Sequence, residues 1–274
     1  MEKQTTKSGQ KGKVLIIMGF VCIGILFLIY SSVQNLELTP DALPIIERIA
    51  IGFYLVLLMS FGAIAYGLYR FHKQKANEDN NKILTFIAKI TFNSKSRKIF
   101  LITFVLYGIF FSFTSGILVY QPEVTFSYHY GASIPSAHIT PCCGEPGYMP
   151  EIIVYLTEHL GLQIIPINLF LQIIVSYLVG LNVALAVNAI YISKKAGGLS
   201  GIGATTGLFI ACPTCVGTFL SLFVSASSTI AFTVAITQFQ TIFILITIPV
   251  LLTTPFIMGR KLKIQSDNCK VDSS

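Results

Sequence analysis

Charged residues are scarce in this chain, and that scarcity indicates its class. Of 274 residues only 11% are charged, 53% are hydrophobic, and the mean hydropathy is +0.73. A soluble domain carries about 25% charged residues, so the composition indicates a membrane protein. The net charge of +7 would point to a nucleic-acid partner only if it covered a water-soluble surface. Its distribution along the chain argues against that class.

Common catalytic signatures are also missing. The sequence has no P-loop, no H-E-x-x-H and no G-x-S-x-G, which excludes nucleotide hydrolysis by the P-loop route and leaves no evident enzyme motif. The predicted spans have almost no ionisable residues, and only Glu47 and Arg48 come close. Ion-coupled transporters normally place such residues inside the bundle, so active transport is disfavoured. Asn182 and Asn188 are expected to hydrogen-bond between helices rather than bind substrate.

In place of charged segments and catalytic motifs, the chain contains long uncharged runs. A bilayer core about 30 Å thick takes roughly 20 apolar residues per helix. The runs therefore predict an all-α polytopic membrane protein, with a six-helix domain over 14–260 and tails at 1–13 and 261–274. The 64 residues Ala196–Gly259 carry no charge. This run is too long for a single span. The expected spans are about 14–34, 49–69, 99–120, 165–192, 199–223 and 239–259.

The basic residues predict the orientation. With both tails in the cytoplasm, every Lys and Arg except Arg48 lies on the inner side, as the positive-inside rule requires. The protein is thus expected in the cell membrane, with the loop 121–164 outside. A cleaved signal peptide is the alternative for the N-terminus. However, the apolar run Val14–Tyr30 is longer than a usual signal core, and no A-x-A-like site follows it.

Two loops carry patterns of their own. In the inner loop 70–98, apolar residues beside lysines over Ile83–Ile90 predict a short helix on the inner leaflet, with a solvated linker as the alternative. In the outer loop, the segment 150–162 begins with Pro150, places apolar residues at helical spacing and reaches Gly161. It predicts a short interfacial helix that roofs the bundle.

The outer loop gathers the ligands that soft metals prefer. Cys142 and Cys143 are adjacent, His138 lies upstream and Met149 lies downstream. Thiolate, thioether and imidazole together suit Cu(I) or another thiophilic ion, and the surrounding prolines and glycines favour a tight turn. The spacing is not that of a zinc finger. A rigid loop whose cysteines are structural or idle is the alternative.

A second sulfur pair lies in the fifth predicted span, in the sequence Cys212-Pro-Thr-Cys215. At about 1.5 Å per residue from Ser200, Cys212 is expected roughly 18 Å into the bilayer, in its outer half. The intervening Pro213 must kink or break the helix, and a restart there would favour a thiolate at Cys212. Cys215 also continues a ladder of small residues at a spacing of four, so close helix packing is the alternative.

Three functions fit these patterns. The first is the handling of a soft metal ion, with copper as the leading candidate and with ligands among Cys142, Cys143, His138, Met149, Cys212 and Cys215. The second is an accessory or structural subunit of a larger membrane complex, for example a copper-dependent membrane enzyme. The third is a thiol–disulfide relay in which Cys212 and Cys215 are the redox pair. The expected partners are the lipid bilayer, other membrane subunits, or a metal- or thiol-carrying protein on the outer side.

Overall fold

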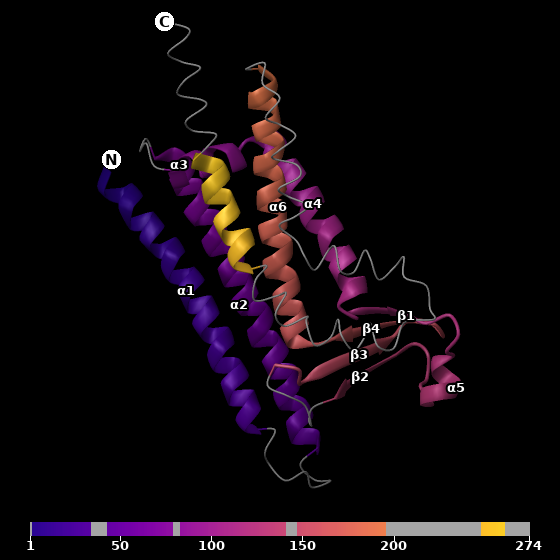
Figure 1. Ribbon diagram of the computed structural model, residues 1–274. Coiled ribbons are helices and arrows are strands. Elements are labelled where there is room, and N and C mark those ends of the chain that lie inside the picture. Colours follow the sequence, from indigo (N-terminus) through magenta and orange to yellow (C-terminus); the bar gives the residue numbers. More distant parts are fainter. Residues whose placement is uncertain (1, 34–42, 79–82, 141–146, 196–247, 261–274) are drawn as a thin grey trace, which may run out of the picture. The chain divides into compact units, whose positions relative to one another are not determined.

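The computed structural model of the chain describes residues 2–33, 43–78, 83–140, 147–195 and 248–260 (Figure 1). Within these residues the protein is mostly helical. The helices are α1 (Glu2–Val33), α2 (Leu43–Asn77), α3 (Ile83–Thr91), α4 (Ser94–Thr114), α5 (Phe126–Tyr130) and α6 (Pro166–Lys195), and a further apolar helix covers Ile248–Arg260. The strands are β1 (Leu118–Tyr120), β2 (Ser136–Thr140), β3 (Glu151–Tyr155) and β4 (Leu160–Ile164).

Four of the described helices are long and apolar enough to cross a membrane. They cover Lys11–Ser32 in α1, Pro44–Asn77 in α2, Ser94–Phe113 in α4 and Pro166–Asn188 in α6. These helices overlap the first four predicted spans and support the assignment as a membrane protein. The predicted span 199–223 lies outside the described residues, and only part of 239–259 is described. The count of six spans and the orientation therefore stay predictions.

The chain divides into two compact units, which are described separately. The first comprises Met1–Gln74 and Ile109–Ile173, and the second comprises Lys75–Gly108 and Ile174–Ser274. The first unit contains α1, nearly all of α2, the strands with α5, and the start of α6. The second contains α3, most of α4, the rest of α6 and the helix Ile248–Arg260.

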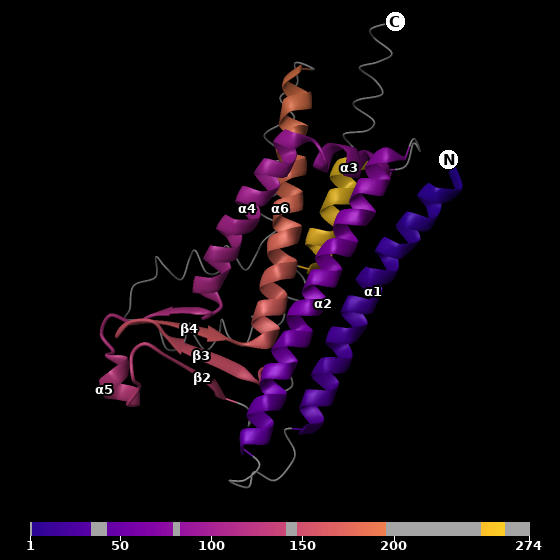
Figure 2. The same cartoon turned by 180° about the vertical axis from the view of Figure 1, so that it is seen from behind.

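In the first unit, α1 and α2 run side by side (Figures 1 and 2), and glycines set how closely they approach. A Cβ atom on Gly67 of α2 would lie 3.0 Å from the carbonyl oxygen of Gly12 and 2.9 Å from Cγ1 of Ile16. Both neighbours belong to α1, so a larger residue would push the two helices apart. Small residues at such contacts allow membrane helices to pack closely.

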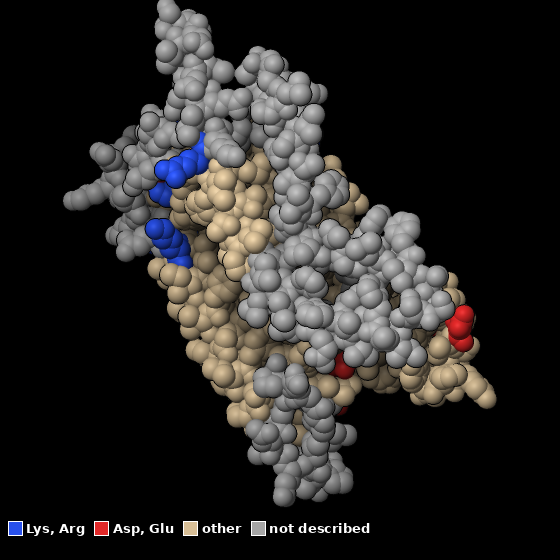
Figure 3. All heavy atoms as spheres, in the orientation of Figure 1, with Lys and Arg blue, Asp and Glu red and all other residues tan. Residues whose placement is uncertain are grey.

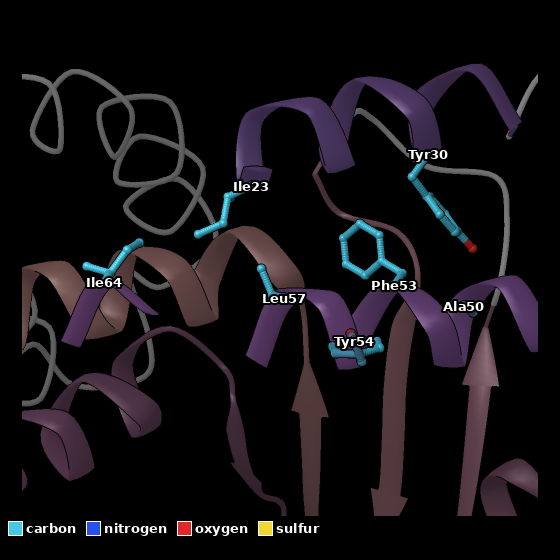
Figure 4. Close-up of a cluster of buried hydrophobic side chains, with 7 residues drawn as sticks. All are labelled: Ile23, Tyr30, Ala50, Phe53, Tyr54, Leu57 and Ile64. Atoms are coloured by element: carbon cyan, nitrogen blue, oxygen red, sulfur yellow. The ribbon is translucent and has the colours of Figure 1, made fainter. Parts of the chain in front are cut away.

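A buried cluster lies where the two helices meet, and Figure 4 shows its seven residues: Ile23, Tyr30, Ala50, Phe53, Tyr54, Leu57 and Ile64. Three isoleucines, one from each of β2, β3 and β4, pack against this cluster. They are Ile139, Ile152 and Ile164, and they form one row across the sheet because Ile152 pairs with both of the others. Through this row, one face of the sheet packs against α1 and α2.

The sheet replaces the interfacial helix that the sequence predicts. Its four antiparallel strands are ordered β1-β4-β3-β2, so the prediction of a helix over 150–162 is wrong. The run Ile152–Tyr155 consists of β-branched and aromatic residues, which favour a strand. Gly161 is not a helix terminator but lies within β4, where a Cβ atom would come 3.2 Å from the Val154 carbonyl oxygen. The apolar residues of this segment fit both a helical and a strand periodicity, and cross-strand packing selects the strand.

The helix α4 ends earlier than the predicted span 99–120. It stops at Thr114, and Leu118–Tyr120 form β1 instead. Gly116 adopts a φ of 73°, a left-handed conformation that commonly ends a helix at this position. The side-chain amide of Asn168, in the first turn of α6, donates to the Ser115 carbonyl oxygen at 3.2 Å. This bond ties the end of α4 to the start of α6.

In the second unit, the short helix that the inner-loop pattern predicts is confirmed as α3. Ile87 of α3 packs with Leu181 and Leu185 of α6. A Cβ atom on Gly259 would lie 2.8 Å from Cγ1 of Ile87, so the helix Ile248–Arg260 passes close to α3 as well. The apolar face of α3 is thus directed at other helices of its unit. Its position on the inner leaflet stays a prediction.

Most charges of the first unit are separated by sign, with Arg48 as an exception at the other end of α2. Lys13 of α1 lies over the ring of Phe71 of α2, with its Nζ 5.8 Å from the ring centroid, so the basic residues near this contact come from both helices. Those residues are Lys11, Lys13, Arg70 and Lys73. Glu123, Glu151 and Glu158 belong instead to the region of the sheet. Figure 3, in the orientation of Figure 1, shows acidic side chains in red in the region of the sheet.

Candidate metal-binding hairpin

The two adjacent cysteines belong to the connection between β2 and β3. These strands pair from Ser136 with Tyr155 to Thr140 with Glu151, so the connection 141–150 starts and finishes at neighbouring points of the sheet. Cys142 and Cys143 lie outside the described residues, as do Cys212 and Cys215. What the structure describes is the two ends of this connection and the groups that hold them.

The hydroxyl of Tyr54 fixes the start of β3 to α2. It lies 2.6 Å from the Pro150 carbonyl oxygen and 2.9 Å from the Ile164 carbonyl oxygen, and its single proton is shared between these two acceptors. Pro150 directly precedes β3 and Ile164 is the last residue of β4. One buried side chain of α2 therefore holds the ends of two strands.

The residues before Pro150 are fixed to α6 and to the buried cluster. The backbone N–H of Ile167, in the first turn of α6, donates to the Gly147 carbonyl oxygen at 3.0 Å. Gly147 has a φ of 91°, a conformation that residues with a side chain rarely adopt. Met149 is half-buried and packs against the buried cluster. Its contacts are those of an apolar anchor for the connection.

His138 is exposed in the middle of β2, four positions before Cys142. Its Nε2 lies 3.1 Å from Oγ of Ser136, and its ring makes an edge contact with that of Tyr155, with centroids 6.3 Å apart and an interplanar angle of 61°. Residues 138 and 155 share one face of the sheet, opposite the isoleucine row. An exposed imidazole in this position is available to a metal ion.

The other two histidines of the outer loop lie near α5. Nδ1 of His159 is 3.0 Å from the Val124 carbonyl oxygen and 3.2 Å from the Gln121 carbonyl oxygen. Since both partners are acceptors, these contacts favour the tautomer with a proton on Nδ1. His129 is exposed on α5. Within the described residues, no three His, Cys, Asp or Glu side chains are grouped so that they would hold a metal ion.

The predicted helix over 150–162 would have placed Glu151 in its first turn. The residue instead opens β3 opposite Thr140. Its side chain is 9% exposed, and no described residue gives its Oε1 a hydrogen-bond partner. The carboxylate is close enough to Tyr54 to act on it electrostatically. The available signal was a lone acidic residue directly before four residues that favour a strand.

Away from the hairpin, the expected role of the two asparagines is confirmed. In the second unit, the side-chain amide of Asn182 donates to the Leu251 carbonyl oxygen at 3.0 Å. The amide of Asn188 donates to Oγ of Ser96 on α4 at 2.7 Å. Both bonds join α6 to another helix, as hydrogen-bonding side chains in membrane spans commonly do. Among the described cysteines, Cys22 is exposed on α1 and free.

Comparison with known proteins adds no relative. No family model, no curated protein and no solved structure matches this chain. The chemistry of the hairpin therefore has to be argued from its own residues.

Proposed function

We propose that this membrane protein handles a thiophilic metal ion, with copper as the first candidate. Cys142 and Cys143 are the primary ligands, and His138 is the third ligand nearest to them in the chain. The Cys212 and Cys215 pair is the second sulfur site. The sheet that carries the first site faces the outside of the cell. Met149 serves the site by anchoring the connection rather than by binding the ion.

The observation that supports this proposal most is the way both ends of the 141–150 connection are held. Thr140 is paired in the sheet, and Gly147 is bonded to Ile167 of α6. The two adjacent cysteines thus belong to a short connection whose described ends are both fixed to other elements. Metal sites benefit from ligands that are held in this way.

The chemistry of the ligands supports the same conclusion. Thiolates select Cu(I) and other soft ions over the hard ions that prefer oxygen. A metal binds the deprotonated thiol, so its capture by the two cysteines releases protons. The basic end of α1 and α2 is the opposite end of that helix pair from the sheet, which agrees with an outer location for the sheet under the positive-inside rule.

Metal content of the purified protein tests the proposal. The full chain is extracted in mild detergent, reduced, exposed to Cu(I) and to Zn(II) separately, and washed. We expect the wild type to retain metal and the Cys142→Ser/Cys143→Ser variant to lose most of it. Cys22→Ser is the matched control, because Cys22 is an exposed thiol on α1, and it should retain metal like the wild type.

Two results would contradict the proposal. One is a wild-type protein that retains neither ion. The other is equal retention by the wild type and the Cys142→Ser/Cys143→Ser variant. A mixed disulfide trapped between a loop cysteine and Cys212 or Cys215 in single-cysteine variants would instead favour the thiol–disulfide relay.

A further inference from the structure

We propose that the four-stranded sheet rests on the membrane surface, with one face in contact with lipid and the other face in water. The lipid belongs to the leaflet opposite the basic end of α1 and α2. This inference concerns what the sheet binds through its surface, so it does not depend on the metal site. It starts from the division of residues between the two faces, which the register of the strands fixes.

The first step is that the face with the isoleucine row is apolar throughout. Ile152 of β3 pairs with Ile139 of β2 and Ile164 of β4, and successive residues of a strand point to opposite faces. The pairing therefore assigns every second residue of each strand to this face. The nine residues of this apolar face are Leu118, Tyr120, Ala137, Ile139, Ile152, Val154, Leu160, Leu162 and Ile164.

The second step is that the opposite face is polar and carries α5. Phe126 of α5 lies on it, because its ring centroid is 5.2 Å from that of Tyr155 and a Cβ atom on Gly161 would come 3.4 Å from its Cε2. Antiparallel sheets commonly have one face packed on apolar groups and one face in water. The polar side chains of this second face are Ser136, His138, Thr140, Glu151 and Gln163.

The third step is that the helix pair covers only one end of the apolar face. The isoleucine row packs against the buried cluster of α1 and α2, and Figures 1 and 2 show the strands extending away from α2. On the two edge strands the same face is open: Tyr120 of β1 is 63% exposed, and Ala137 of β2 is exposed as well. The apolar face thus continues beyond its contact with the helices.

The fourth step is the level of the sheet along the helix pair, which selects lipid as the partner. Tyr54, whose hydroxyl holds two strand ends, lies seventeen positions before Phe71, the ring that Lys13 contacts. Tyr30 lies seventeen positions after Lys13 in α1, and its ring centroid is 5.0 Å from that of Phe53. Both helices therefore place the sheet about 25 Å from the basic contact.

This distance is close to the thickness of the hydrocarbon core, which is about 30 Å. With the basic contact at one membrane surface, the sheet lies at the other surface, where tyrosine rings such as that of Tyr120 are favoured. Amphipathic helices at this level bury their apolar face about 5–10 Å deep between the headgroups and the acyl chains. The apolar face of the sheet offers lipid the same kind of surface.

Tryptophan fluorescence tests this inference on the full-length protein. The chain has no tryptophan, so a single introduced one reports alone. Tyr120→Trp and Ala137→Trp place it at the two edges of the apolar face. Tyr128→Trp is the matched control, because Tyr128 is also an exposed tyrosine, at 87%, but lies on the helix that covers the polar face.

Each variant is reconstituted in phosphatidylcholine vesicles with or without brominated acyl chains, and iodide is added on both sides of the membrane. We expect brominated lipid to quench the tryptophan at 120 and at 137, and we expect both to emit at shorter wavelength than the control. The tryptophan at 128 should be quenched by iodide and not by brominated lipid.

Three results would overturn the inference. Quenching of residue 120 or 137 by iodide instead of brominated lipid would place that edge of the apolar face in water. Shielding of either residue from both quenchers would show that protein rather than lipid covers it. Equal quenching of residues 120 and 128 by brominated lipid would show that the two faces do not differ in their contact with the membrane. None of these results bears on the retention of metal, so the proposed function is tested separately.

Discussion

The side-chain amide of Asn182 donates a hydrogen bond to the carbonyl oxygen of Leu251 at 3.0 Å. Leu251 lies four positions before Pro255, in the helix Ile248–Arg260. Proline has no backbone N–H, so it leaves the carbonyl four residues earlier without its helical partner. Asn182 supplies the missing donor from α6. A buried polar side chain and a proline on another helix thus compensate each other inside the second unit.

Replacement of Asn182 by Leu should destabilise the second unit. Asn182 is 1% exposed, and its loss leaves the Leu251 carbonyl oxygen unpaired in an apolar environment. Hydrogen bonds between membrane helices are worth about 0.6 kcal/mol on average and up to about 1.7 kcal/mol. We therefore expect a loss of about 1 kcal/mol, measured as the shift in unfolding of the purified protein by denaturing detergent.

The Pro255→Ala background provides the control for this experiment. Alanine restores a backbone N–H for the Leu251 carbonyl oxygen, so removal of Asn182 in that background should cost less than in the wild type. Equal costs in the two backgrounds would show that Asn182 does not act through this carbonyl. The comparison is a double-mutant cycle, which isolates the interaction between the two sites.

Substitution of Gly67 by Val should weaken the pairing of α1 and α2. A Cβ atom at this position would come within 3.0 Å of the Gly12 carbonyl oxygen, and backbone atoms cannot move aside without separating the helices. Overpacking of this kind costs about 1–3 kcal/mol. Gly62→Val is the matched control on the same helix, because a Cβ atom there has no neighbour within 4 Å. A similar loss of thermal stability in both variants would refute the close contact.

Replacement of Tyr54 by Phe should loosen the start of β3 while the ring stays in the buried cluster. The change removes the donor shared by the Pro150 and Ile164 carbonyl oxygens. Leaving a buried acceptor unsatisfied costs about 1–3 kcal/mol. Hydrogen exchange should therefore quicken in β3 and β4, and the protein should retain less metal.

Tyr66→Phe on the same helix controls for the loss of a tyrosine hydroxyl. Tyr66 is 54% exposed, so its variant should exchange and retain metal like the wild type. If Tyr54→Phe exchanges at the wild-type rate, the hydroxyl does not hold the strands.

Local sequence signals predict the membrane-length helices, whereas the sheet depends on contacts between distant segments. Each of the four membrane-length helices comes from a long apolar run, and such a run needs no partner to be recognised. The helix predicted in place of β3 is wrong because Ile152, Ile153 and Leu156 fit a helical period as well as a strand. The pairing of Ile152 with Ile139 and Ile164, which decides the matter, joins segments that the sequence does not mark as neighbours.

The same distinction applies to the candidate site. Adjacent cysteines with a histidine four positions upstream predict metal binding through residue type alone. The burial of Glu151 cannot be read from residue type, because it depends on how β2 and β3 pair. Asn182 lies between these cases: its role as a link between helices was predicted, but the need created by Pro255 became visible only when the two helices were seen together.

Labelling of single cysteines from either side of the membrane tests the orientation on which the proposed function depends. In a background whose own cysteines are replaced by serine, Tyr128→Cys places a thiol on α5, where Tyr128 is 87% exposed. Lys73→Cys places one at the basic end of α2, which is also exposed. A membrane-impermeant maleimide should label residue 128 in intact cells and residue 73 only after permeabilisation, because basic residues are retained in the cytoplasm. The reverse pattern would place the sheet and its cysteines inside the cell, where thiols are kept reduced, and capture of a metal ion from the outside would be impossible.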